Sequence, residues 1–239
     1  MVHAKIACQK NFRNIGFQDP DVIHKATVKS HSCDVVDVIY RALNKQNMCP
    51  FILLSYAHQF HWILFAIDHT VWIYDSLRQP RSKYQHLIDL IDKAWARFLQ
   101  KHLKVSDESF NPLQFRSDKT CMRQEQGNNL CGYYVCEGID KFVSERGQIT
   151  PETFNRWVMK EELIEEARVR AIQESIYGFL LDEVIDKNGE FYSDPKLTCV
   201  IAFVIGACLI CNISNTTCIL LDLSSVGQYE LYIFMYVYI

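Results

Sequence analysis

The chain has 239 residues, of which 49% are hydrophobic and 22% are charged. This balance is ordinary for a globular protein and excludes a disordered segment or a coiled coil, and the length suits one domain with a tail. The net charge of −3 gives no basis for binding nucleic acid, so no nucleic-acid partner is expected.

Ten cysteines occur at irregular spacings, several of them inside apolar runs. The N-terminal residues lack the apolar core of a signal peptide. We therefore expect reduced thiols and a protein of the nucleus or cytoplasm, because disulfides are rare in those compartments.

The first half of the chain begins with residues 1–13, which carry no strong pattern and are expected to be a truncated or flexible N-terminus. Apolar residues between Val35 and Leu43 recur at helical spacing and predict a helix packed on the core. The short apolar run 51–55 follows Pro50 and predicts a central strand, with residues 56–60 as the connection to the next strand.

Two further strands are predicted at 61–67 and 71–74, joined by the turn 68–70. His61 opens the first of these strands, and Asp75 directly follows the second. Antiparallel strands joined by a short turn bring these two ends together, so His61 and Asp75 should be neighbours. A carboxylate in that position holds an imidazole in one tautomer while the other ring nitrogen faces a nucleophile.

Each of these two residues has a competitor. His58 lies in the predicted connection, where a histidine is more often a solvated polar residue than a base. Asp68 lies in the turn, where aspartate is common for turn chemistry alone. We favour His61 and Asp75 on the geometry of the triad.

The second half of the chain contains two amphipathic patterns, at 84–102 and within 151–185, which predict helices with a structural role. Thr150 before Pro151 is a helix-start signal. Between the two patterns, residues 105–111 are expected to be a loop and residues 113–116 a short strand.

A polar loop, 124–130, is followed by Cys131 and then by a segment with apolar residues at helical spacing, from Val135 to Val143. Cys131 should therefore lie at a helix N-terminus, where unpaired N–H groups and the helix dipole favour a thiolate. Gln124 is positioned to donate a side-chain N–H to an oxyanion, beside the backbone N–H of Cys131.

The other cysteines give weaker patterns. Cys121 and Cys136 lack the glycine-containing approach of Cys131 and are expected to be small core residues. Cys208 and Cys211 form a lone CxxC with no second pair nearby, so no metal site is predicted.

Taken together, His61-Trp62, Asp75-Ser76-Leu77 and the loop into Cys131-Gly132-Tyr133-Tyr134-Val135 resemble the catalytic domain of the ubiquitin-like-protein proteases, the SUMO-protease superfamily. The sequence motifs are most similar to those of a divergent plant branch of this superfamily, which is often carried by transposable elements. The resemblance covers residues 14–194.

The resemblance implies an α+β, papain-like fold with a small mixed sheet flanked by helices. It also implies a cysteine peptidase or isopeptidase that cleaves after the C-terminal glycine of a SUMO-type ubiquitin-like modifier, without a cofactor. The partners would be the modifier or its protein conjugates.

The resemblance also implies roles for individual residues. His61, Asp75, Gln124 and Cys131 would be catalytic, and Trp62 and Gly132 would contact the substrate. Glu125 occupies the place six residues before the nucleophile where the family has its glutamine, so Gln124 and Gln126 flank the expected position. We favour Gln124, with Gln126 as the alternative. Trp62 has a second interpretation as core filler in a strand.

An alternative function is a catalytically silent, transposon-derived remnant or a module that only binds a ubiquitin-like protein. It is motivated by Leu130, which stands where better-known members have aspartate directly before the nucleophile.

The tail 195–239 differs in composition from the rest of the chain. Its stretch 197–211 is almost wholly apolar, at or below the minimum length for crossing a bilayer. A tail-anchored membrane protein and an extension that is not part of the enzyme are both open, and we favour the extension.

Overall fold

The computed structural model describes residues 15–20, 22–58, 60–102, 113–117, 121–144, 163–190 and 192. The expectations for residues 1–13, the loop 105–111, the helix start at Thr150-Pro151 and the tail 195–239 lie outside these residues. The chain divides into two compact units, Val2–Glu165 and Glu166–Tyr238. The sheet and all the predicted site residues belong to the first unit.

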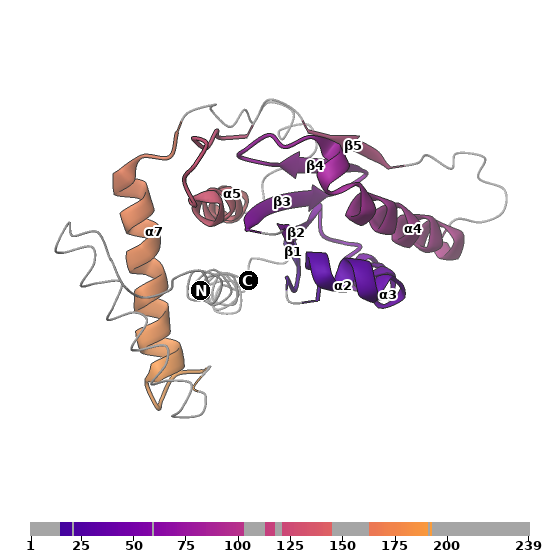
Figure 1. The fold of residues 1–239 in the computed structure, drawn as a ribbon. Coiled ribbons are helices and arrows are strands. Elements are labelled where there is room, and N and C mark those ends of the chain that lie inside the picture. Colours follow the sequence, from indigo (N-terminus) through magenta and orange to yellow (C-terminus); the bar gives the residue numbers. More distant parts are fainter. Residues whose placement is uncertain are drawn as a thin grey trace. The chain divides into compact units, whose positions relative to one another are not determined.

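The first unit is built on a five-stranded mixed sheet in the order β1-β2-β3-β4-β5 (Figure 1). The two central pairs are antiparallel, whereas β1 pairs parallel with β2 and β4 pairs parallel with β5. The prediction of a mixed sheet in an α+β fold is confirmed. The strands are β1 (Ile15–Gln18), β2 (Phe51–His58), β3 (His61–Ile67), β4 (Thr70–Tyr74) and β5 (Gln114–Arg116).

Helices cover both faces of the sheet (Figure 1). The described helical elements of this unit are α2 (Lys25–Ser30), α3 (Ser32–Lys45), the short 3-10 turn η1 (Arg81–Lys83), α4 (Gln85–His102) and α5 (Cys131–Ser144). α3 and α4 pack on one face, where their apolar residues join those of the strands in a single buried core. The predicted helices at 35–43 and 84–102 correspond to α3 and α4, so both predictions are confirmed.

The strand β3 is buried along its whole length, because it is central and covered on both sides. Its residues Ile63, Phe65 and Ile67 face the core shared with α3 and α4. On the other face, the ring of Phe142 from α5 packs against Phe51 and Tyr74, with centroids 5.5 and 5.8 Å apart. This packing fixes α5, and therefore Cys131 at its start, relative to the sheet.

The prediction of a connection at residues 56–60 is wrong. β2 continues to His58, and its last residues pair with the first residues of β3 up to the pair His58 and His61. The polar character of these residues suggested a loop, but Tyr56 and His58 are buried by their neighbours across the sheet. β1 and α2 were not predicted, because four and six residues are too few to show a periodicity.

The second unit contains α7 (Glu166–Phe179), followed by a π-helical turn, η2 (Leu180–Ile185). Among the described residues of the predicted 151–185 pattern, residues 163–165 are not helical and the helix begins at Glu166. That part of the prediction is wrong. No helix in the described part of the chain is long and apolar enough to cross a membrane, and the stretch 197–211 lies outside that part.

Candidate active site

The imidazole of His61 and the carboxylate of Asp75 form a buried pair. His61 is the first residue of β3, and Asp75 follows the last residue of β4. The antiparallel register opposes Leu64 and Tyr74, so one further step places Asp75 beside Ile63 and diagonal to His61. The His61 Nε2 atom lies 2.7 Å from Asp75 Oδ1, and both side chains are more than nine-tenths buried.

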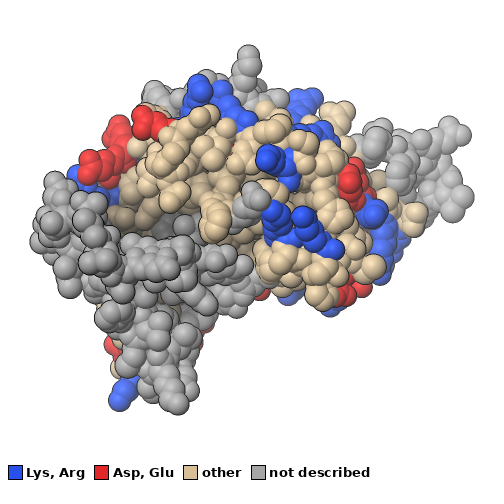
Figure 2. Space-filling model, viewed as in Figure 1, with Lys and Arg blue, Asp and Glu red and all other residues tan. Residues whose placement is uncertain are grey.

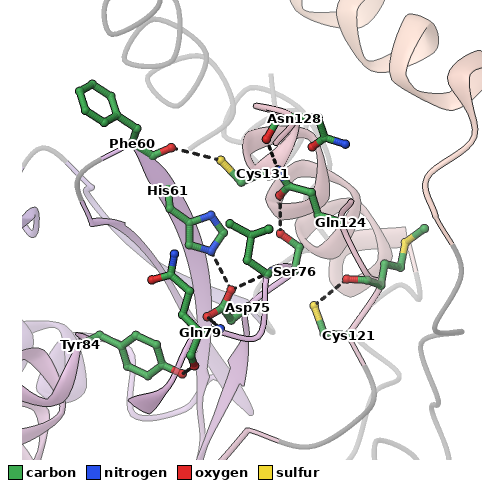
Figure 3. A network of polar contacts seen from close by, with 12 residues as sticks. Phe60, His61, Asp75, Ser76, Gln79, Tyr84, Cys121, Gln124, Asn128 and Cys131 are labelled. Atoms are coloured by element: carbon green, nitrogen blue, oxygen red, sulfur yellow. Dashed lines mark hydrogen bonds and ion pairs between the residues drawn. The ribbon is translucent and has the colours of Figure 1, made fainter. Parts of the chain in front are cut away.

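The turn after β4 holds the Asp75 carboxylate in place (Figure 3). The backbone N–H of Leu77 donates to Oδ1 at 3.0 Å, and that of Gln79 donates to Oδ2 at 2.8 Å. The same turn is closed by the N–H of Arg78, which donates to the Asp75 carbonyl at 3.0 Å. Both carboxylate oxygens are therefore fixed by the backbone, and the direction in which Oδ1 meets His61 is set independently of the imidazole.

Cys131 is the first residue of α5, as the sequence predicted. The loop before it turns through Gly127, whose φ of 90° is in the left-handed region that favours glycine. The side chain of Asn128 then accepts a hydrogen bond from the N–H of Leu130 at 3.3 Å. The thiol projects from the helix N-terminus, where the dipole and the unpaired N–H groups favour a negative charge.

The thiol of Cys131 lies beside His61, on the side of the imidazole away from Asp75 (Figure 3). It donates a hydrogen bond to the carbonyl of Phe60, the residue directly before His61, with the Sγ–O distance at 3.7 Å. The other ring nitrogen of His61, Nδ1, is buried and has no hydrogen-bond partner among the described residues. Asp75, His61 and Cys131 are thus arranged in line, with Nδ1 available to exchange a proton with the thiol.

The environment of His61 favours its protonated form. Burial alone would lower the pKa of the imidazole, but the Asp75 carboxylate and the Cys131 sulfur together raise that pKa to about 9. An imidazolium at neutral pH is the partner that a cysteine thiolate requires, and it is also the acid that a leaving amine needs.

Gln124 is buried beside Cys131, whereas Gln126 is exposed. The Gln124 side chain is held at both ends (Figure 3). Its Oε1 accepts a hydrogen bond from the hydroxyl of Ser76 at 2.9 Å, and its Nε2 donates to the carbonyl of Asn128 at 2.6 Å. The backbone N–H of Gln124 also donates to the Ser76 carbonyl at 2.9 Å. An amide nitrogen carries two hydrogens, so one N–H remains for an oxyanion.

Tyr134, one turn after Cys131, connects the nucleophile helix to the Gln124 loop. Its hydroxyl donates to the carbonyl of Arg123 at 3.0 Å and accepts a hydrogen bond from the N–H of Ile164 at 3.2 Å. The start of α5 and the residue before Gln124 are therefore linked directly.

The competitors of His61 and Asp75 occupy other positions. His58 lies on β2 directly opposite His61 rather than in a loop, and it has no carboxylate partner in the described part of the structure. Asp68 is in the turn at the far end of β3, where its side chain accepts a hydrogen bond from the N–H of Thr70. Among the described residues, neither of them forms a hydrogen bond with a thiol.

Cys121 and Cys136 are both buried, so the expectation that they are core residues holds. Burial raises the pKa of Cys121 to about 12, which keeps that thiol protonated and unreactive. The five described cysteines, Cys33, Cys49, Cys121, Cys131 and Cys136, are all free thiols.

The two residues that are predicted to contact the substrate, Gly132 and Trp62, lie in different surroundings. Gly132 is the second residue of α5 and lies next to the nucleophile. Trp62 is only 4% exposed, and strand alternation directs its side chain to the sheet face opposite that of His61. Among the described residues of the site, Phe60 is the exposed aromatic, at 73% exposure. Phe60 was missed because nothing in the sequence distinguishes it from a residue of an ordinary hairpin.

The described residues contain no group of three or more His, Cys, Asp or Glu side chains that could hold a metal ion. The CxxC of Cys208 and Cys211 lies outside the described residues. The described site consists of a nucleophile, Cys131, a base, His61, and an orienting carboxylate, Asp75.

Comparison with known families gives one match. Residues 10–177 match the model of the Ulp1 protease family, C-terminal catalytic domain. The matched segment contains every residue of the site. A search of curated proteins finds no match for the chain.

Proposed function

The chain belongs to the Ulp1 protease family, and from this premise we propose that it is a cysteine peptidase cleaving after the C-terminal glycine of a ubiquitin-like modifier. The family acts on such modifiers and on their conjugates. The observation that carries the proposal is the position of His61 between the Asp75 carboxylate, at 2.7 Å, and the Cys131 thiol at the start of α5.

In the first half of the proposed reaction, Cys131 Sγ attacks the carbonyl carbon of the terminal glycine. The thiol proton is already on Nδ1 of His61, because the pKa of that imidazole is raised to about 9. The sulfur therefore attacks as a thiolate, and Asp75 stabilises the imidazolium. The carbonyl oxygen becomes an oxyanion, which receives hydrogen bonds from the free N–H of Gln124 and from the Cys131 backbone. Collapse of this intermediate breaks the C–N bond, and His61 returns the proton to the leaving amine.

In the second half, the modifier remains attached to Cys131 as a thioester. His61, now neutral, takes a proton from water, and the hydroxide attacks the thioester carbon. Collapse of the second oxyanion releases the modifier with a free carboxylate and returns the sulfur and imidazole to their starting state. Each step uses residues of this chain and water only.

The choice of modifier within this class is a further part of the proposal. We propose a SUMO-type modifier, with Gly132 contacting its glycine tail, and a protein working in the nucleus or cytoplasm. Trp62, which is only 4% exposed, is assigned to its second interpretation as a core residue of the strand. The sequence motifs support the choice of a SUMO-type modifier. The free thiols among the described cysteines support the nucleus or cytoplasm. The kinship with the plant, transposon-borne branch stays a prediction.

Gln124 is the proposed oxyanion donor because it is buried at the site while Gln126 is exposed. A cleavage assay on a SUMO precursor with a C-terminal extension tests this with two matched variants. Gln124→Ala should lower kcat by about 10²- to 10³-fold, and Gln126→Ala should leave it close to wild type. The reverse order would reassign the donor. Wild-type chain that is folded but inert toward every modifier precursor would favour the binding module instead.

A further inference from the structure

Three lysines gather around His58, the residue that faces His61 across the sheet. Lys25 and Lys29 belong to α2, and Lys83 ends η1. Burial lowers the pKa of His58, and the positive charges of Lys25, Lys83, His61 and Lys29 lower it further. The three lysines lie on elements that pack together, because α2 contacts both β2 and α4, and α4 contacts η1. We call Lys25, Lys29 and Lys83 the basic patch.

The fold brings these lysines together from two separate segments. A parallel bridge between His24 and Ala57 holds the start of α2 beside the end of β2. The side chain of His86, near the start of α4, bonds the carbonyl of Val28 in α2 at 2.9 Å. η1 precedes α4 directly, so the same contact keeps Lys83 near α2. The basic patch therefore adjoins the end of β2, and β2 ends opposite His61.

The positive charge of the basic patch is not compensated by any acidic side chain in the described part of the chain. None of the three lysines forms an ion pair with any residue that the structure describes, although Arg97 pairs with Asp37, Lys141 with Glu137 and Arg170 with Glu166. Lys29 and Lys83 are exposed and Lys25 is half-buried. Figure 2 shows basic side chains gathered over the region of α2 and η1, with acidic side chains at the border of the group rather than inside it.

This concentration of positive charge occurs in a chain whose net charge is −3. A fold does not need three unpaired lysines close together, because like charges repel at short range. A partner of opposite charge would relieve that repulsion and would be attracted from solution. The place of the patch, next to the pair His58 and His61, puts such a partner within reach of the proposed scissile bond.

We propose that the basic patch docks an acidic polypeptide segment of the substrate. The catalytic consequence rests on the proposed peptidase function, whereas the binding itself does not. The acidic segment can belong to the modifier, before the glycine pair, or to the conjugated protein, after it. A protein segment suits the patch better than nucleic acid, because three lysines on an acidic chain form no extended basic track.

The binding test uses the full chain carrying Cys131→Ala, so that the probe is not cleaved. Fluorescence anisotropy measures the Kd of labelled peptides with a central Gly-Gly pair. One peptide has glutamates before the pair, one has glutamates after it, and a third has glutamines at all these positions. A labelled single-stranded oligonucleotide is the competing class of ligand.

Two double variants with the same change in charge are compared in this background. The patch variant combines Lys29→Glu and Lys83→Glu, and the control variant combines Lys45→Glu and Lys93→Glu. All four lysines are exposed. Lys29 and Lys45 both lie in the last turn of their helices, so the effect on the helix dipole is matched. Circular dichroism checks that both variants are folded.

We expect one glutamate peptide to bind more tightly than the glutamine peptide, with an affinity that falls as salt is added. The patch variant should weaken that binding by roughly tenfold, and the control variant by less than about twofold. The peptide that binds identifies the side of the glycine pair. Equal losses in the two variants, no preference for glutamate, or tighter binding of the oligonucleotide would each overturn the proposal. If the chain with Cys131 intact binds the glutamate peptide and also fails to cleave any modifier precursor, that result would count against the peptidase function alone.

Discussion

The carboxylate of Asp75 determines both the orientation and the charge of His61. Two backbone N–H groups hold its oxygens at 3.0 and 2.8 Å, so the carboxylate keeps its place when the imidazole changes protonation. Burial opposes the charged imidazole, and the Asp75 carboxylate is the first of the groups that outweigh it. Removing the charge of Asp75 should therefore change how the protein responds to pH.

The stability of the fold should fall as the pH rises through the pKa of His61. That pKa is raised from 6.5 to about 9, so the stabilising contribution is fully present below about pH 6.5 and is lost as the pH rises through about 9. The loss is on the order of 3 kcal/mol. Asp75→Asn should reduce it, because the amide leaves the imidazolium without its counter-ion.

Urea unfolding at about pH 6 and about pH 9.5 measures this loss for the two proteins. We expect the free energy of unfolding of the wild type to fall more between these values than that of Asp75→Asn. An equal fall in both proteins would show that Asp75 does not stabilise the charged imidazole.

Ser76 holds the amide of Gln124 through its hydroxyl, at 2.9 Å. Ser76→Ala would leave the buried Oε1 of Gln124 without a donor and should cost about 1–3 kcal/mol of stability. It should also lower kcat more than it changes KM, because the oxyanion donor loses its fixed orientation.

Ser55→Ala is the matched control for Ser76→Ala. The hydroxyl of Ser55 is equally buried but has no hydrogen-bond partner in the described structure, so its removal should change neither stability nor kcat appreciably. Steady-state kinetics and urea unfolding on both variants provide the comparison. If the two variants behave alike, Ser76 does not position Gln124.

The turn after β4 contains the non-glycine residue that has a positive φ in the described part of the chain. Arg78 has a φ of 50°, in the left-handed region where asparagine is tolerated and β-branched residues are strained. Arg78→Asn and Arg78→Val both remove the guanidinium, so the difference between them reports on the backbone alone.

We expect Arg78→Val to be less stable than Arg78→Asn by about 1–2 kcal/mol. Activity should follow the same order, because the N–H groups of Leu77 and Gln79 in this turn hold Asp75. The midpoints of urea unfolding and the cleavage rates of the two variants measure both effects. Equal midpoints would mean that the turn adapts without strain.

The elements that sequence predicted best are those with a long or clear periodicity. α3 and α4 show helical spacing over three turns or more, and β3 is a continuous apolar run. The end of β2 was mistaken for a loop because its residues are polar or aromatic, and only pairing with β3 makes them strand. β1 is too short to have a pattern and exists because β2 offers it an edge.

At the scale of the whole molecule, the contacts of the site also fall into those that the sequence predicted and those that it did not. The proximity of His61 and Asp75 follows from a hairpin, which is local, and so sequence order was enough to predict it. The Ser76–Gln124 bond and the contact of Cys131 with Phe60 join residues 48 and 71 positions apart. No local pattern encodes such contacts, since they depend on how α5 packs against the sheet.

The catalytic domain is proposed to span residues 14–194, and the tail 195–239 is proposed to play no part in the reaction. Removal of the tail should therefore leave kcat/KM for a modifier precursor within about twofold of that of the full chain, provided both are equally folded. Parallel expression of the full chain and of residues 1–194, with cleavage assays on both, tests this. A large loss of activity in the shorter, folded chain would assign the tail a role in catalysis.

The central claim is that Cys131 is the nucleophile of a peptidase acting on ubiquitin-like modifiers. The most direct measurement incubates the chain and Cys131→Ala with a panel of ubiquitin-like proteins bearing C-terminal electrophiles, and detects covalent adducts by mass. We predict an adduct with a SUMO-type modifier that is absent in Cys131→Ala. A folded wild-type chain that forms no adduct with any modifier, or an adduct that persists in Cys131→Ala, would contradict the claim.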